Sequence, residues 1–227
     1  MLAVPDQSYL SVWCADFPEE LMLERLGAFL GTVPFSASRP GFTHLTVRAI
    51  DPSETPLLEQ DFRSAPLDAP AVVELLREHL HGDCAAEIRA YRDLSLLDDA
   101  TGKWKKEPQP IDISCFGEDY DSGVWRESGH FLVNLGFEHY FTGHAGLLGI
   151  QQIRRPVAET PEEARLLEVM AWPENLERYQ KETRENIRSL LDWVSRIETE
   201  MPVRRVQLWS EGDGDFEARM EEIMAAR

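Results

Sequence analysis

Residues that could perform chemistry are concentrated between Gln109 and Gly146. This stretch holds half of the six histidines (His130, His139 and His144), together with Cys115 and an acidic loop. A cysteine beside a histidine can form a nucleophile–base pair, and histidines with carboxylates can hold a metal ion. We therefore expect any polar functional surface to lie in this stretch.

The spacing of the histidines argues against a metal site on a helix. His139 and His144 are five residues apart with Gly143 between them, whereas two histidines that bind zinc from one helix face are four apart. A loop site formed by Glu138, His139 and His144 stays open as an alternative. We nevertheless expect the protein to bind no metal and no other cofactor.

Strand alternation separates the candidate nucleophile from the candidate acid. In the stretch IDISCF, which we predict to be a strand, Ile111, Ile113 and Cys115 share one face. Asp112 lies on the other, more polar face, so we expect Cys115 in the core and Asp112 toward solvent. As an alternative, a catalytic role stays open for His130, His139, His144, Cys115 and Asp112.

Aromatic and acidic side chains in the same stretch favour recognition. Tyr120, Trp125 and Tyr140 stand among glycines and polar residues, where aromatic side chains often serve binding. Asp119 and Asp121 lie in a loop that lacks the glycine and glutamate positions of an EF-hand calcium loop. We predict that these three aromatic and two acidic residues belong to a binding surface.

The composition indicates an acidic globular protein. The 227 residues include 41 acidic and 23 basic side chains, for a net charge of -18, and 43 % of them are hydrophobic. Such a charge repels phosphate backbones and anionic lipid surfaces, so we expect neither nucleic acid nor a membrane as partner. A basic protein or a small molecule is the partner that this charge allows, and the oligomeric state is left open.

Cysteine usage and the N-terminal residues predict a cytoplasmic location. The three cysteines are far apart in the sequence and form no CxxC motif, which is typical of a reducing compartment. The first residues lack the basic and apolar regions of a signal peptide. No apolar run reaches the length of about 18 residues that a transmembrane helix needs.

Alternating and amphipathic segments predict an α+β fold. In the N-terminal part, strands at 9–14, 42–50, 57–63 and 85–91 and helices that begin near Asp16 and Asp68 follow the ferredoxin-like order. In the second part we predict strands at 111–116, 130–135, 147–153 and 205–209. Helices follow at 161–172, where Thr160 is the cap, at 174–200 and at 215–226.

These elements predict a mainly antiparallel sheet with helices packed on it, in one α+β domain spanning residues 1–227. A sub-division stays open as an alternative. In that case residues 1–100 would form a ferredoxin-like half, and residues 101–227 a strand pair followed by a helical half.

Two functional classes fit these observations. The chain has no GxSxG, GxGxxG, P-loop or HExxH motif. We therefore expect a binding or protein-interaction module inside the cell rather than an enzyme, and an acidic inhibitor of the immunity type is one form of it. The alternative is a small-molecule hydrolase that uses the central histidines and acids, with or without a metal.

Overall fold

The computed structural model describes residues 6–98, 103–144, 147–148, 161–212 and 214–225. Its centre is a seven-stranded sheet in the order β3-β2-β4-β5-β6-β1-β7, in which every neighbouring pair is antiparallel. The strands are β1 (Gln7–Cys14), β2 (His44–Ala49), β3 (Leu58–Asp61), β4 (Cys84–Asp98), β5 (Lys103–Phe116), β6 (Phe131–Phe137) and β7 (Val203–Ser210).

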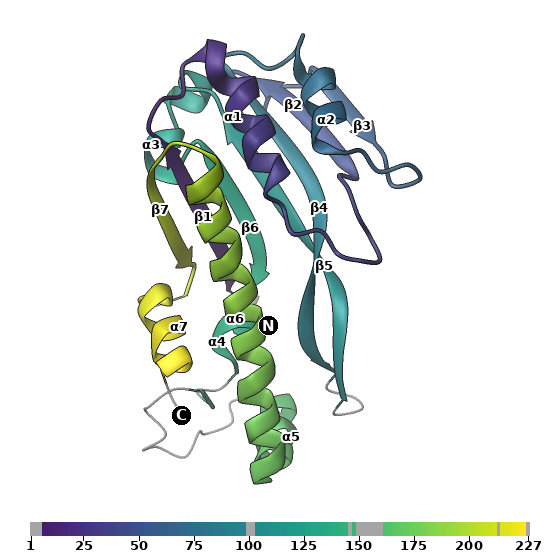
Figure 1. The fold of residues 1–227 in the computed structure, drawn as a ribbon, viewed down its shortest axis with the longest axis vertical. Helices are drawn as coiled ribbons and strands as arrows, with labels where there is room; N and C mark the ends of the chain where they lie inside the picture. The colour runs from purple at the N-terminus through teal and green to yellow at the C-terminus, as the bar shows by residue number, and fades with distance from the viewer. Residues whose placement is uncertain (1–5, 99–102, 145–146, 149–160, 213, 226–227) are drawn as a thin grey trace.

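Three helices cover one face of this sheet (Figure 1), namely α1 (Glu19–Gly31), α2 (Ala69–Leu76) and α6 (Pro173–Glu200). The remaining helical elements are shorter. They are a 3-10 turn η1 (Tyr120–Ser122), α3 (Trp125–Ser128), α4 (His139–Thr142), α5 (Pro161–Met170) and α7 (Phe216–Ala225).

The core lies between the sheet and these three helices. Phe29 of α1 stacks on Phe131 of β6 with ring centroids 4.4 Å apart, and Trp193 of α6 packs at 6.2 Å from Phe29. All three side chains are fully buried. Burial of each large apolar side chain stabilises the fold by about 2–3 kcal/mol.

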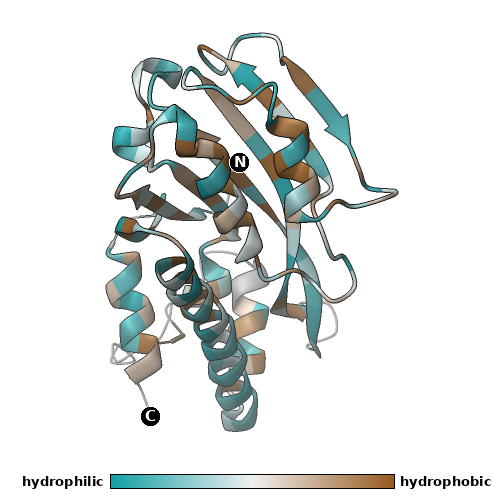
Figure 2. Ribbon diagram, turned by 45° about the horizontal axis from the view of Figure 1, so that its top comes forward, coloured by the Kyte–Doolittle hydropathy of each residue, from teal (hydrophilic) through white to brown (hydrophobic). Residues whose placement is uncertain are grey.

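The long helix α6 shows why the sequence forms these elements. Pro173 occupies its first turn, where the fixed φ angle of proline suits a helix start. Ile187, Leu190, Trp193 and Ile197 recur every three or four residues and are buried, which places them on one face. The rest of α6 is largely hydrophilic (Figure 2). The helix predicted at 174–200 is therefore confirmed.

The predicted α+β class with a mainly antiparallel sheet is confirmed, whereas the ferredoxin-like arrangement is not. The first six elements do alternate as strand, helix, strand, strand, helix, strand. However, β1 pairs with β6 and β7, and it lies three positions from β4 and four from β2 in the sheet. The pairing partners of β1 come from the second half of the chain, so local patterns in the first hundred residues could not indicate them.

The central hairpin is longer than the predicted strands. Continuous pairing joins β4 to β5 from Ala85 with Phe116 as far as Asp98 with Lys103. Residues 99–102 and Thr160 lie outside the described residues, as does most of the strand predicted at 147–153. Leu147 and Leu148 are not in a strand. The sheet takes strands from both predicted halves of the chain, and the domain division itself stays a prediction.

None of the helices within the described ranges combines the length and the apolar character needed to cross a bilayer.

Candidate functional site

The face of the sheet opposite α1, α2 and α6, hereafter the open face, carries the largest set of polar side chains brought together by the fold. Strand alternation sends every second residue of each strand to this face. The cross-strand register then lines these residues up in a row across all seven strands. From β3 to β7 the row is Asp61, His44, Arg89, Asp112, Asn134, Tyr9 and Trp209.

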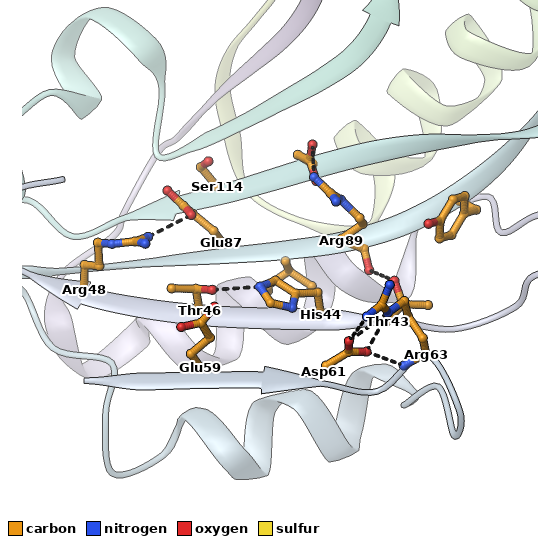
Figure 3. A pocket seen from close by; sticks show the side chains of 13 residues that line it. Thr43, His44, Thr46, Arg48, Glu59, Asp61, Arg63, Glu87, Arg89 and Ser114 are labelled. Carbon is orange, nitrogen blue, oxygen red and sulfur yellow. Dashed lines mark hydrogen bonds and ion pairs between the residues drawn. The ribbon is translucent and has the colours of Figure 1, made fainter. Parts of the chain in front are cut away.

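One half of the open face is a polar hollow of about 580 Å³ over β3, β2, β4 and β5. Its floor is crossed by ion pairs (Figure 3). Arg89 donates from Nε to Asp112 Oδ1 at 2.6 Å and from Nη2 to Oδ2 at 3.0 Å. The other two pairs join Arg48 to Glu87 at 3.0 Å and Arg63 to Asp61.

Hydrogen bonding to Arg63 lowers the pKa of Asp61 to about 2, so this carboxylate is charged at all physiological pH values. Next to it, the His44 ring lies 3.0 Å from the Thr46 hydroxyl, between Nε2 and Oγ1. Glu59, also in the hollow, forms no ion pair with a described residue. Since every arginine of the hollow already has a carboxylate partner, the unpaired charge of the hollow is negative.

The other half of the open face is aromatic. Tyr9 of β1 stacks on Trp209 of β7 with ring centroids 4.4 Å apart. Trp209 Nε1 donates to the buried Ser11 hydroxyl at 3.0 Å, and the Tyr9 hydroxyl donates to Glu211 at 2.8 Å. Burial, followed by the Glu211 carboxylate, raises the pKa of Tyr9 to about 12. These contacts hold the two rings in one orientation, which suits a preorganised contact surface.

Trp13, four residues beyond Tyr9 on the same face of β1, is covered rather than exposed. Its indole N–H donates to the Arg126 carbonyl of α3 at 3.3 Å, and the Arg205 guanidinium lies 4.4 Å from its ring centroid. The short helix α3 thus closes the Trp13 end of the aromatic half, and the Tyr9–Trp209 pair stays half-exposed.

No hydrogen bond joins the candidate nucleophile Cys115 to its candidate base His130, although they come from neighbouring strands. Cys115 is fully buried in the core, and burial raises the pKa of its thiol. The His130 ring lies between Phe17 and Trp125, at 4.3 and 4.4 Å, and its Nδ1 accepts the backbone N–H of Cys14 at 3.0 Å. Desolvation lowers the pKa of His130 to about 4, so the imidazole is neutral at pH 7.

His139 and His144 do meet, at the opposite end of β6 from His130. Their rings stack with centroids 4.0 Å apart, and burial, followed by the charge of His144, lowers the pKa of His139 to about 3. Within the part of the chain that the structure describes, no three histidine, cysteine, aspartate or glutamate side chains gather closely enough to hold a metal ion. Glu138, His139 and His144 therefore form no three-ligand group there.

The five predicted binding residues do not form one surface. Tyr120 is buried at 2 % exposure, and the Trp125 indole donates to the Glu118 carbonyl at 3.0 Å. Tyr140 lies beyond the far end of β6, roughly 20 Å away along a seven-residue strand. Asp119 and Asp121 are exposed beside Tyr120.

Of the residues predicted to be functional, only Asp112 lies on the open face. Sequence reasoning missed Arg89, Glu87, Tyr9 and Trp209. Their strands alternate polar and apolar residues, which indicated an outward face for each strand alone. The register that brings them into one row joins residues up to two hundred positions apart, and no local pattern contains it.

Ion pairs dominate the polar hollow of the open face. Three of its four carboxylates are paired with arginines and Glu59 is not, and its lining residues include no cysteine. Small-molecule sites are usually apolar and enclosed, whereas this hollow is polar. In comparisons with known proteins, no family model matches this chain, and neither a curated protein nor a solved structure matches it.

Proposed function

We propose that the protein is a protein-binding module that holds a basic partner protein on its open face. The observation that supports this most is the row that crosses all seven strands, charged at the β3 end and aromatic at the β7 end. Tyrosine, tryptophan and arginine are the side chains most enriched among the residues that dominate protein interfaces.

Charge supports a basic partner. The net charge of -18 attracts cationic proteins over distances set by the Debye length, about 8 Å at physiological salt, and raises their association rate. At contact, Glu59 offers an unpaired carboxylate, and the ion-paired arginines are not available to an acidic partner. Inhibition of a basic enzyme, by covering its active site, is the form of this function that such steering suits best.

The test begins with a photo-crosslinking amino acid placed at Gln207 on the open face, and separately at Glu185 on the exposed side of α6. A partner captured from Gln207 and not from Glu185 would then be purified, and its affinity measured directly. We expect a basic protein whose Kd rises at least tenfold between low and physiological salt. We expect Trp209→Ala and Glu59→Lys to weaken binding at least tenfold, and Glu185→Lys to leave it unchanged.

Equal affinity of the open-face variants and the wild type would overturn the proposal, as would an affinity that does not depend on salt. The hydrolase alternative gains no geometric support among the described residues. His130 makes no hydrogen bond to the buried Cys115, and the His139–His144 pair lies beyond the other end of β6.

A further inference from the structure

The second edge of the sheet carries a groove that the open face does not include. β7 is the last strand of the sheet, and no described strand pairs with its outer side. A polar groove of about 480 Å³ follows this edge, lined by residues 205–210 and the start of α7. An adjoining apolar groove of about 330 Å³ lies between β7, α6 and α7. The two share Val206, Leu208 and Glu217.

The backbone of β7 directs hydrogen-bonding groups outward into this groove. Leu208 N–H donates to the exposed Glu217 carboxylate at 2.8 Å, so it points away from β1. Because backbone groups alternate along a strand, the N–H and carbonyl of Val206 point to the same outer edge. A single side chain of α7 therefore occupies the position that a neighbouring strand's carbonyl would take.

The floor of the apolar groove would receive alternate side chains of an added strand. Leu191 and Val194 of α6 and Met220 and Met224 of α7 line it, together with Val206 and Leu208. Leu191 is 42 % exposed, which is unusual for a leucine at the junction of a strand and two helices. An apolar side chain placed here would remove this surface from water, at about 25 cal/mol for each Å².

The rim of the groove is acidic. Glu198, Glu217, Glu221 and Asp215 line the two adjoining parts, and Arg205 is the one basic residue among all of their lining residues. Arg205 in turn lies over the Trp13 ring on the open face. A second copy of this chain would bring the same acids and a further charge of -18 to this edge, which disfavours pairing between copies.

We infer that β7 binds an extended peptide segment by strand addition, and that this segment alternates apolar and basic residues. Its backbone would pair with Val206 and Leu208, and its carbonyl would replace Glu217 at the Leu208 N–H. Its apolar side chains would enter the groove between α6 and α7. Its lysines or arginines, on the other face of the added strand, would meet Asp215 and the displaced Glu217 in the polar groove along the edge. The inference does not depend on the open face binding any partner.

A synthetic peptide of alternating lysine and valine tests this directly. We expect this peptide to bind. A second peptide, in which the valines are kept and every lysine is replaced by glutamate, should have a Kd at least tenfold higher. On the protein, Asp215→Asn combined with Glu217→Gln should weaken binding about fivefold, whereas Glu185→Gln on the exposed side of α6 should not. Unchanged affinity in the double variant would overturn the acidic rim as the source of specificity.

Backbone methylation of the peptide distinguishes strand addition from a charge contact. In an antiparallel addition the valine N–H groups point to β7, and in a parallel addition the lysine N–H groups do. We therefore expect one of two peptides, N-methylated on all valines or on all lysines, to lose at least tenfold in affinity while the other binds normally. Loss in both peptides, or in neither, would overturn strand addition.

A matched pair of variants tests the edge itself. Val206→Pro removes an outward N–H at a sheet edge, where proline is tolerated, whereas Val206→Thr keeps the N–H and the β-branched shape. We expect only the proline variant to lose peptide binding, with circular dichroism showing that both variants are folded. If sedimentation showed instead that the wild type is a dimer and that Val206→Pro is a monomer, a second copy would occupy this edge and the inference would be wrong.

Discussion

Arg89 and Asp112 stand opposite each other on β4 and β5 and are joined by two hydrogen bonds, at 2.6 and 3.0 Å, in the middle of the open face. The pair is about half exposed, with side-chain exposures of 48 % and 47 %. Asp112 is thus a partnered carboxylate that faces solvent, and not a buried acid poised for proton transfer.

We predict that this ion pair contributes little to folding. An exposed pair is screened by water and is worth about 0.2–1 kcal/mol even with good geometry. A double-mutant cycle of Arg89→Ala and Asp112→Ala, followed by urea denaturation, should give a coupling energy in that range that shrinks in high salt. A coupling above about 2 kcal/mol would contradict the solvated environment described for the open face.

From the lowered pKa of His130 we predict that the folded protein loses stability in mild acid. The folded pKa of His130, about 4, lies below the unfolded value of 6.5, so the unfolded chain binds the proton more readily between these values. The stabilisation is complete above pH 6.5 and is lost as the pH falls through this window. Between pH 7 and pH 5 the loss from His130 should be about 2 kcal/mol of unfolding free energy.

Urea denaturation at the two pH values measures this loss. His130→Asn keeps an oxygen that can accept the Cys14 N–H but cannot titrate, so its stability should vary less with pH. His139 contributes with the same sign and remains in both proteins. An unchanged slope in His130→Asn would show that another group senses the pH.

The buried position of Arg92 leads us to predict that this charged residue can be replaced without loss of stability. Its side chain is 1 % exposed, Nη2 donates to Ser189 at 3.3 Å, and Nη1 has no hydrogen-bond partner among the described residues. The rings of Phe141 and Trp193 lie 5.7 and 5.8 Å from the guanidinium carbon. Burial lowers its pKa to about 10, so it stays charged at pH 7.

Burial of a charge without a counter-ion is costly, whereas an apolar side chain of similar length suits this core. We expect Arg92→Met to leave the free energy of unfolding unchanged or to raise it by about 1 kcal/mol. Arg92→Ala should lower it by about 2–3 kcal/mol because it creates a cavity. Thermal and urea denaturation of the two variants would settle this, and a large loss in the methionine variant would contradict it.

The thiols are expected to react slowly in the folded protein. Burial raises the pKa of Cys14 to about 12 and of Cys84 to about 11, and it raises that of Cys115 as well. A thiol with a pKa near 11 is ionised to about one part in a thousand at pH 8. Labelling with a chromogenic disulfide should therefore be slow for all three and become fast once the protein is unfolded in guanidinium. Rapid labelling that disappears in Cys115→Ala would support the hydrolase alternative instead.

Local patterns in the sequence predicted much of the secondary structure and the direction of several side chains. The alternation of Ile111 to Phe116 correctly placed Cys115 in the core and Asp112 toward solvent. The helix at 174–200 and the strand at 205–209 were likewise predicted, because helix and strand periods are properties of consecutive residues.

The central loop shows where such reasoning misleads. Tyr120 stands among glycines and acids, yet it is buried, and the loop folds into the turn η1 and the helix α3. Asp121 holds a positive φ of 44° while its N–H donates to the Ile50 carbonyl at 2.7 Å, a contact across seventy residues. Composition alone did not indicate that a distant backbone carbonyl orders this loop.

The sequence by itself determined the acidic charge, the periods of the main helices and strands, and which residues of each strand point the same way. Only the tertiary structure decided that β1 lies between β6 and β7, so that Tyr9 meets Trp209 and Asp112 joins a row that crosses seven strands. The physical reason is that strand order and register depend on contacts between residues far apart in the chain, whose free energies act only once the core has assembled.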